Sequence, residues 1–277
     1  MSFLPPEGTA LLRSLGAGTT FEVALVSRGE LACVCKRLRS RMLTEPRAHS
    51  ALEREARVLA MGQLGCVPRL LGTGADAAGP YLLESCISGA SLRELVEGWL
   101  ERGKLLPSDL LHFLIRRSFE ALAELHALGD EQGPLELVHG DLGPDHVLLD
   151  TEGQIYFVDF GQARWRGMPS VPEPGERGTL PYVAPELARG ETVAEQRSDV
   201  FALAATLGYA ALGRPPCTEE ALPARLIEIS ERGVELGAIE ASQLLGTVAK
   251  DVLLRALGFD PHARLGSAER VCSELAR

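Results

Sequence analysis

Three charged residues suited to phosphate chemistry follow one another along the chain in a fixed order. Lys36 ends an apolar run, Asp141 lies two residues after His139, and Asp159 opens an Asp-Phe-Gly run 18 positions after Asp141. One carboxylate can accept a proton from a hydroxyl, the other can hold a divalent metal ion, and the ammonium group can bind a polyphosphate. This set of groups, in this order, predicts phosphoryl transfer.

Lysine is retained at position 36 although the chain almost never uses it. Only three of the 28 basic residues are Lys, and the chain contains no Asn. Arg is a planar fork and Lys a compact point charge, so the two are not interchangeable in a tight phosphate site. The choice of Lys36 therefore favours a functional role. Residues 49–63, which include Glu55, have the spacing of a helix.

A glycine turn lies ahead of Lys36. Gly16 and Gly18 are separated by one residue, and Phe21 stands where a third glycine would complete a loop that covers phosphates. Two glycines alone are a weak signal, since a simple hairpin turn has the same pattern. The turn therefore supports the prediction of a phosphate site only together with Lys36 and the two aspartates.

Together these motifs resemble the eukaryotic-type (Hanks-type) serine/threonine protein kinase family over nearly the whole chain. Residues 178–186 resemble the segment that seats a peptide substrate. Residues 198–203, 213–216 and 260–264 resemble structural anchors of the family. The resemblance implies the kinase fold, ATP with Mg²⁺ or Mn²⁺, a protein substrate, and an ion pair between Glu186 and Arg264.

The resemblance also implies a role for each charged candidate. Asp141 is the catalytic base, and Lys36 binds the α- and β-phosphates of ATP while it pairs with Glu55. Asp159 holds the metal ion. His146 stands where the family has a metal-binding Asn. Sugar kinases of the lipopolysaccharide-core type, which look similar here, also have a His at the matching place. Imidazole suits Mn²⁺ better than Mg²⁺, which prefers oxygen ligands.

An adenine pocket is implied by the same resemblance. Leu83 sits behind the adenine, the backbones of Glu84 and Cys86 bond its edge, and Leu148 forms the floor. The nucleotide-binding residues implied in this way are Leu15, Gly16, Gly18, Val23, Val34, Lys36, Glu84, Cys86 and Leu148.

Two glycines in the catalytic loop depart from the family pattern. Gly143 replaces a Lys, and Gly140 replaces the Arg that reads a phosphate on the activation segment in many such kinases. The hydroxyl-bearing residues of that segment are Ser170, Thr179 and Tyr182. We predict that phosphorylation there is not the main switch. Mass spectrometry that finds a stoichiometric phosphate needed for activity would contradict this.

The secondary-structure pattern predicts an α+β protein with two lobes. Residues 14–35 alternate as paired strands, while the pattern beyond residue 90 is mainly helical. We assign residues 1–85 to an N-terminal, nucleotide-binding lobe of a small antiparallel β-sheet plus one helix. Residues 86–277 form a larger, mainly helical lobe with the catalytic loop, activation segment and substrate seat. Together the two lobes make one kinase domain.

Composition limits the classes of partner. The net charge of −10 and the pI near 5.2 argue against nucleic acid. The most apolar window, residues 200–213, is shorter than the roughly 20 residues that span a bilayer. We interpret it as a buried helix and expect no membrane insertion. The first residues have no secretory pattern, which favours a cytoplasmic location.

Three functions stay open from the sequence. The first is ATP-dependent phosphorylation of Ser or Thr in proteins, which residues 178–186 favour. The second is a pseudokinase that serves as a nucleotide-binding or scaffold module, which Phe21, Gly143 and His146 favour. The third is a small-molecule kinase, because His139-Gly140-Asp141 also resembles aminoglycoside and choline kinases. The substrate and the regulator are not specified by the sequence.

Overall fold

The computed structural model describes residues 3–61, 64–168 and 179–277 and confirms the predicted α+β class. The chain forms two compact units. The smaller is drawn from Met1–Gln63, Val67–Ser88 and Asp159–Gly161, and the larger from Leu64–Cys66, Gly89–Val158 and Gln162–Arg277. Residues 159–161 were predicted to belong to the second lobe. Ser170, and residue 178 of the predicted peptide-seating segment, lie outside the described residues.

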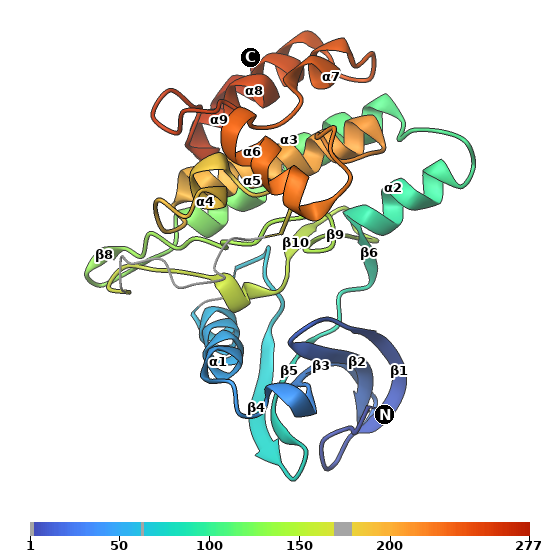
Figure 1. The fold of residues 1–277 in the computed structure, drawn as a ribbon. Coiled ribbons are helices and arrows are strands. Elements are labelled where there is room, and N and C mark those ends of the chain that lie inside the picture. Colours follow the sequence, from blue (N-terminus) through green and yellow to red (C-terminus); the bar gives the residue numbers. More distant parts are fainter. Residues whose placement is uncertain (1–2, 62–63, 169–178) are drawn as a thin grey trace. The chain divides into compact units, whose positions relative to one another are not determined.

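An antiparallel sheet of five strands forms most of the smaller unit (Figure 1). Its strands follow one another across the sheet in the order β1-β2-β3-β5-β4. Their bounds are β1 Ala10–Ala17, β2 Phe21–Arg28, β3 Leu31–Leu38, β4 Leu70–Asp76 and β5 Gly79–Ser85. The pairing of β3 with β5 places Cys35 opposite Leu83 and Lys36 opposite Leu82. Because side chains alternate along a strand, these two pairs lie on opposite faces of the sheet.

One face of this sheet carries the apolar core of the smaller unit. Ala24, Val26, Cys33, Cys35 and Leu83 are buried together there, with Phe3 packed on them. The other face carries Lys36. Helix α1, Pro46–Ala60, begins with a proline at its first position and buries Leu52, Glu55, Val58 and Leu59. The alternation of side chains along β3 and β5 thus gives the sheet one apolar face and one face that carries charged residues.

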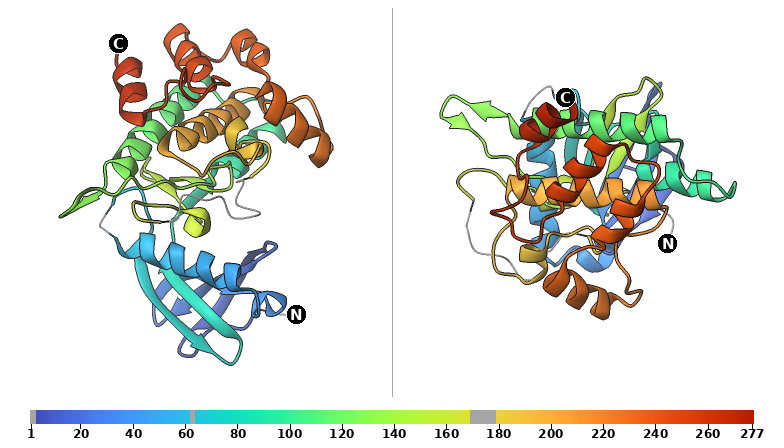
Figure 2. Two further views of the ribbon diagram at one scale, coloured as in Figure 1. Left: turned by 60° about the vertical axis from the view of Figure 1, so that its left-hand side comes forward. Right: turned by 90° about the horizontal axis from the view of Figure 1, so that it is seen from above.

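Helices dominate the larger unit (Figures 1 and 2). α3 contacts both α5 and α9, and α5 also contacts α8. The helices are α2 Leu92–Leu100, α3 Ser108–His126, α4 Pro185–Ala188, α5 Gln196–Leu212, α6 Leu222–Arg232, α7 Leu236–Ala241, α8 Thr247–Ala256 and α9 Ala268–Leu275. The apolar window over residues 200–213 belongs to α5, which is buried almost throughout, as predicted. Within the described residues, no helix combines the length and apolar character needed to cross a bilayer.

Short strands flank the loop that carries Asp141 in the larger unit. β7, Gly129–Asp130, and β8, Gly133–Pro134, form a two-stranded ribbon ahead of it. β9 and β10 follow the loop and form a sheet with β6, in the order β10-β9-β6. Its strands are β6 Gly89–Ser91, β9 Val147–Asp150 and β10 Ile155–Phe157. The loop between these sheets is therefore anchored at both ends.

Candidate active site

Lys36 is buried in an ionic cluster within the smaller unit. Its Nζ lies 2.7 Å from each carboxylate oxygen of Glu55 and 3.1 Å from Oδ1 of Asp159. Burial by itself lowers the pKa of Lys36, but Asp159 and Glu55 outweigh it, so the pKa is raised well above its usual value. Lys36 is thus a fixed cation, as a phosphate-binding site requires.

Asp159 holds an unusual backbone conformation in this cluster. Its φ is +67°, a region that residues other than glycine rarely adopt. Such conformations persist where surrounding contacts enforce them, and they are frequent at functional sites. Here the contact with Lys36 helps to hold the Asp159 carboxylate, a hard oxygen ligand suited to Mg²⁺ or Mn²⁺.

Glu84 occupies the position that the sequence analysis gave to Leu83. Leu83 packs in the apolar core on the other face of the sheet, so the expectation that it backs an adenine beside Lys36 is wrong. Glu84 pairs with Val34 and shares the face of Lys36. The side chain is 5% exposed, and within the described residues its Oε2 has no hydrogen-bond partner. A carboxyl group therefore stands where an apolar side chain was expected.

The ionisation of Glu84 should make the stability of the protein depend on pH. Burial raises the pKa of Glu84 to about 8, Glu55 adds to the rise, and Lys36 opposes it. The folded state therefore favours the protonated form, and this stabilisation is lost as the pH rises from the unfolded value near 4.5 through about 8. We expect wild type to lose stability relative to Glu84→Gln over this range, by up to about 1.4 kcal/mol per pH unit. Urea unfolding at several pH values measures this, and parallel curves for the two proteins would refute it.

The glycine turn brings Phe21 to Lys36. The backbone N–H of Gly18 donates to the carbonyl of Phe21 over 2.9 Å, which closes the turn between β1 and β2. The ring centroid of Phe21 then lies 5.3 Å from Nζ of Lys36, within cation–π range. Val23 pairs with Lys36 and lies on its face of the sheet. The residue that replaces the third glycine thus places an aromatic ring beside the predicted phosphate-binding cation.

In the larger unit, Asp199 holds the backbone of the loop that carries Asp141. Its carboxylate accepts hydrogen bonds from the backbone N–H groups of His139, at 2.7 Å, and Gly140, at 2.9 Å. Nε2 of His126 lies 3.0 Å from the same carboxylate. Asp199 is 1% exposed, so these bonds are shielded from water. A residue of α5 thereby holds the backbone of the loop in place.

Gly140 has a conformation that excludes the Arg expected at its position. Its φ is +80°, and a Cβ atom added there would lie 2.6 Å from the backbone carbonyl oxygen of Gln162. A side chain would require a different backbone at this point. The backbone conformation at position 140 therefore suits glycine and not Arg.

The side chain of Asp141 contacts that of Thr179. The hydroxyl of Thr179 donates to Oδ1 of Asp141 over 2.6 Å. Gly143 lies close by, where an added Cβ would meet Tyr182 and Thr179 at ordinary contact distances of 3.6 and 3.9 Å. The catalytic loop and the segment after residue 178 thus meet at the Asp141 carboxylate.

His146 is oriented by the backbone of Asp141. Nδ1 of His146 lies 2.6 Å from the carbonyl oxygen of Asp141, and a carbonyl can only accept, so Nδ1 carries the proton. In the neutral ring the lone pair is then on Nε2, the nitrogen whose chemistry suits metal ligation. The neighbouring Asp145 is engaged elsewhere, because Arg93 binds both of its carboxylate oxygens at 2.6 and 2.8 Å.

If His146 is a metal ligand, the metal site should prefer Mn²⁺ to Mg²⁺. Imidazole nitrogen is a softer donor than the amide oxygen of Asn, and Mg²⁺ favours oxygen. We expect His146→Asn to shift the ratio of activities toward Mg²⁺. Initial rates measured with each metal for both proteins give this ratio. An unchanged ratio would rule out metal ligation by His146.

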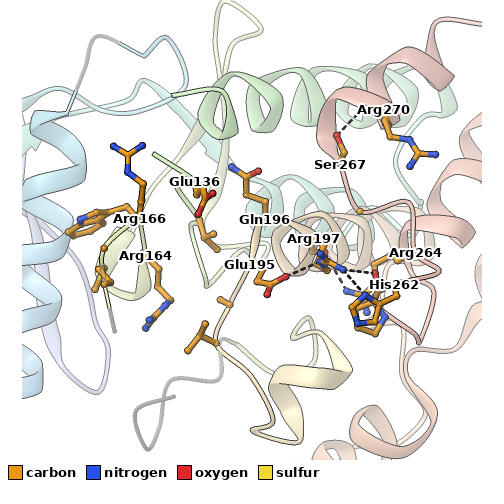
Figure 3. Close-up of a pocket in the computed structure, with 18 residues that line it drawn as sticks. Glu136, Arg164, Arg166, Glu195, Gln196, Arg197, His262, Arg264, Ser267 and Arg270 are labelled. Atoms are coloured by element: carbon orange, nitrogen blue, oxygen red, sulfur yellow. Dashed lines mark hydrogen bonds and ion pairs between the residues drawn. The ribbon is translucent and has the colours of Figure 1, made fainter. Parts of the chain in front are cut away.

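Arginines line a separate cavity of about 650 Å³ in the larger unit (Figure 3). Arg264 is bound there to both carboxylate oxygens of Glu186, at 2.9 and 3.0 Å, which confirms the predicted ion pair. Arg197 pairs with Glu195 at 2.9 Å, and Arg166 with Asp130 at 2.6 Å. The pairs of Arg264 and Arg166 join residues that are 78 and 36 positions apart in the chain.

The structure thus gathers the predicted residues into one group in each unit. The smaller unit holds Lys36, Glu55 and Asp159 together, and its sheet carries Val23, Val34 and Glu84, with Leu15 and Gly16 in β1 and Cys86 after β5. The larger unit holds Asp141 and His146 together, with Leu148 in β9.

Three contacts in these groups were not predicted from the sequence. They are the Glu84 side chain on the face of Lys36, the Thr179 hydroxyl on Asp141, and Arg93 on Asp145. Of these, the place of Glu84 had a partial signal in the sequence. Residues two apart in a strand share a face, so Glu84 must lie on the face of Leu82 and not on that of Leu83.

Comparison with known proteins places these residues in a family. The chain matches the family model of the protein kinase domain over residues 9–275. It is 28% identical to a probable serine/threonine-protein kinase, SCO3848, of Streptomyces coelicolor, over 85% of this chain and 34% of that protein. It is 27% identical to the serine/threonine-protein kinase PknB of Mycobacterium leprae, over 95% of this chain and 42% of that protein. The chain therefore spans less than half the length of these relatives.

Proposed function

The chain belongs to the protein kinase domain family, and from this we propose that it transfers the γ-phosphoryl group of ATP to Ser or Thr of protein substrates. The observation that carries the proposal is the cluster in which Lys36 binds Glu55 and Asp159 within 3.1 Å. A buried cation between carboxylates is a poor stabilising element by itself, but it suits a polyphosphate. The names of the relatives support Ser and Thr as acceptors.

In the proposed reaction, Asp141 accepts the proton of the substrate hydroxyl. The hydroxyl oxygen forms a bond to the γ-phosphorus, the bond from that phosphorus to the β–γ bridging oxygen breaks, and ADP leaves. Thr179 donates to Oδ1 of Asp141 and orients the carboxylate. The Asp199 contacts keep the loop backbone in place while the proton moves.

Two groups of residues would bind the nucleotide and its metal ion. Lys36 binds the α- and β-phosphates, and the sheet residues of 1–85 surround the base, while residues 86–277 supply Asp141 and the protein seat. By the resemblance of the chain to the family, Asp159 and His146 are the residues that would hold Mg²⁺ or Mn²⁺. When bound, the metal ion neutralises charge on the β- and γ-phosphates. The carboxylate and the imidazole are both chemically suitable donors for such an ion.

Phe21 favours one alternative, a nucleotide-binding module that does not transfer phosphate. Its ring lies 5.3 Å from Nζ of Lys36, beside the place where the phosphates would bind. A ring in this place would hinder the close approach of backbone and phosphate that a glycine allows. Transfer and binding must therefore be measured separately.

The proposed function is tested with γ-labelled ATP and a generic protein substrate, with Mg²⁺ and Mn²⁺ in parallel. We expect label on Ser or Thr with wild type, and loss of label with Lys36→Met. Lys104 is an exposed lysine, so Lys104→Met is the matched control and should transfer label normally. Nucleotide binding without transfer by wild type would favour the alternative function.

A further inference from the structure

Glu84 is a buried carboxyl group that the rest of the smaller unit leaves unsatisfied. It is 5% exposed, and within the described residues Oε2 has no hydrogen-bond partner. Buried polar atoms are almost always paired, so an unpaired one in a functional region needs an explanation. The face of the sheet that bears Glu84 also bears Lys36 and Val34, both implicated in nucleotide binding.

Lys36 does not supply the missing partner. An ammonium group has three N–H bonds, and three short contacts account for them: two with Glu55 at 2.7 Å and one with Asp159 at 3.1 Å. Three carboxyl groups therefore surround one cation. Burial and the charge of Glu55 favour the neutral form of Glu84.

A neutral carboxyl group presents a donor and an acceptor side by side. Its O–H can donate and its carbonyl oxygen can accept, as the two ends of a Gln amide do. Gln and Asn recognise adenine by donating to N7 and accepting from the 6-amino group. Guanine offers two acceptors on this edge, N7 and O6, so the carbonyl oxygen would be left without a partner.

We propose that Glu84 determines base specificity by hydrogen-bonding the N7 and 6-amino edge of adenine. This inference rests on the proposed function, in which the phosphates bind at Lys36 and the backbone of residues 84–86 bonds the opposite edge of the base. A base between these two points lies along the face of β5 that carries Glu84. The unsatisfied oxygen thereby gains a partner only when adenine is bound.

Calorimetric titration of the whole chain with ATP, 7-deaza-ATP and GTP tests the proposal without requiring catalysis. 7-deaza-ATP lacks N7, so wild type should bind it roughly tenfold more weakly than ATP, and GTP more weakly still. Glu84→Leu should bind ATP and 7-deaza-ATP equally. Glu84→Gln, which keeps a donor and an acceptor, should restore the preference for ATP.

The outcomes separate this inference from the proposed function. If wild type binds ATP and 7-deaza-ATP equally, Glu84 does not read N7, while the proposed function stands. If Glu84→Leu keeps the preference of wild type, another residue reads the base and the proposal fails. Should Glu84→Leu not fold, equal binding of ATP and 7-deaza-ATP by wild type still overturns the proposal. Failure of wild type to bind any nucleotide would overturn both proposals.

Discussion

Asp141→Asn should reduce phosphoryl transfer by about 10²- to 10⁴-fold, the range typical for removal of a general base. The amide cannot accept the proton of the substrate hydroxyl at neutral pH. Its oxygen can still accept the hydrogen bond that Thr179 donates over 2.6 Å, so the loop should keep its structure. The rate of label transfer from γ-labelled ATP, with the thermal unfolding temperature measured alongside, checks both expectations.

Asp145→Asn is the matched control for this variant. It makes the same chemical change on the same loop, at a half-exposed carboxylate that binds Arg93 and not Thr179. We expect only a small loss of rate, because an exposed ion pair contributes little. Equal losses in the two variants would show that the loop structure, and not the base, had been removed.

Arg264→Met should lower the free energy of unfolding by about 3–5 kcal/mol. It leaves the buried carboxylate of Glu186 without the two hydrogen bonds that it now accepts at 2.9 and 3.0 Å. The side chain of Arg264 is 0% exposed and that of Glu186 is 6% exposed, so water cannot replace the lost partner. Urea unfolding monitored by circular dichroism measures the change.

Two further variants make this measurement specific. Arg255→Met also removes an arginine bound to carboxylates, but its pairs with Asp251 and Glu274 are exposed, and we expect a loss below about 1 kcal/mol. Glu186→Gln combined with Arg264→Met removes the stranded charge and should recover part of the stability. A similar loss of stability in Arg255→Met and Arg264→Met would contradict the expectation that breaking a buried ion pair costs more than breaking an exposed one.

Local patterns predicted the backbone of the fold well. The alternating run over residues 14–35 became β1, β2 and β3, and the helical pattern around Glu55 became α1. Such features depend on residues close in the chain, where side-chain period and turn residues determine the structure. The ion pair of Lys36 with Glu55 was predicted from resemblance, and the structure places these two side chains together.

The faces of β5 show where sequence reasoning failed. An apolar residue, Leu83, was expected beside Lys36, but the pairing of β3 with β5 places Glu84 there. A shift of one residue exchanges every side chain between the faces of a sheet, and the register depends on the partner strand. The Arg93–Asp145 contact joins residues 52 positions apart, and no local pattern indicates it.

The burial of Lys36 also makes the protein suited to chemical labelling. Lysines are so few that an amine-reactive reagent has three side chains to choose from, Lys36, Lys104 and Lys250. Lys104 is exposed, whereas Lys36 is 4% exposed and held as an ammonium ion by Glu55 and Asp159. Acylation needs the free amine, so Lys36 should react last. Modification at this one position would then report the opening of the ionic cluster, with no added probe.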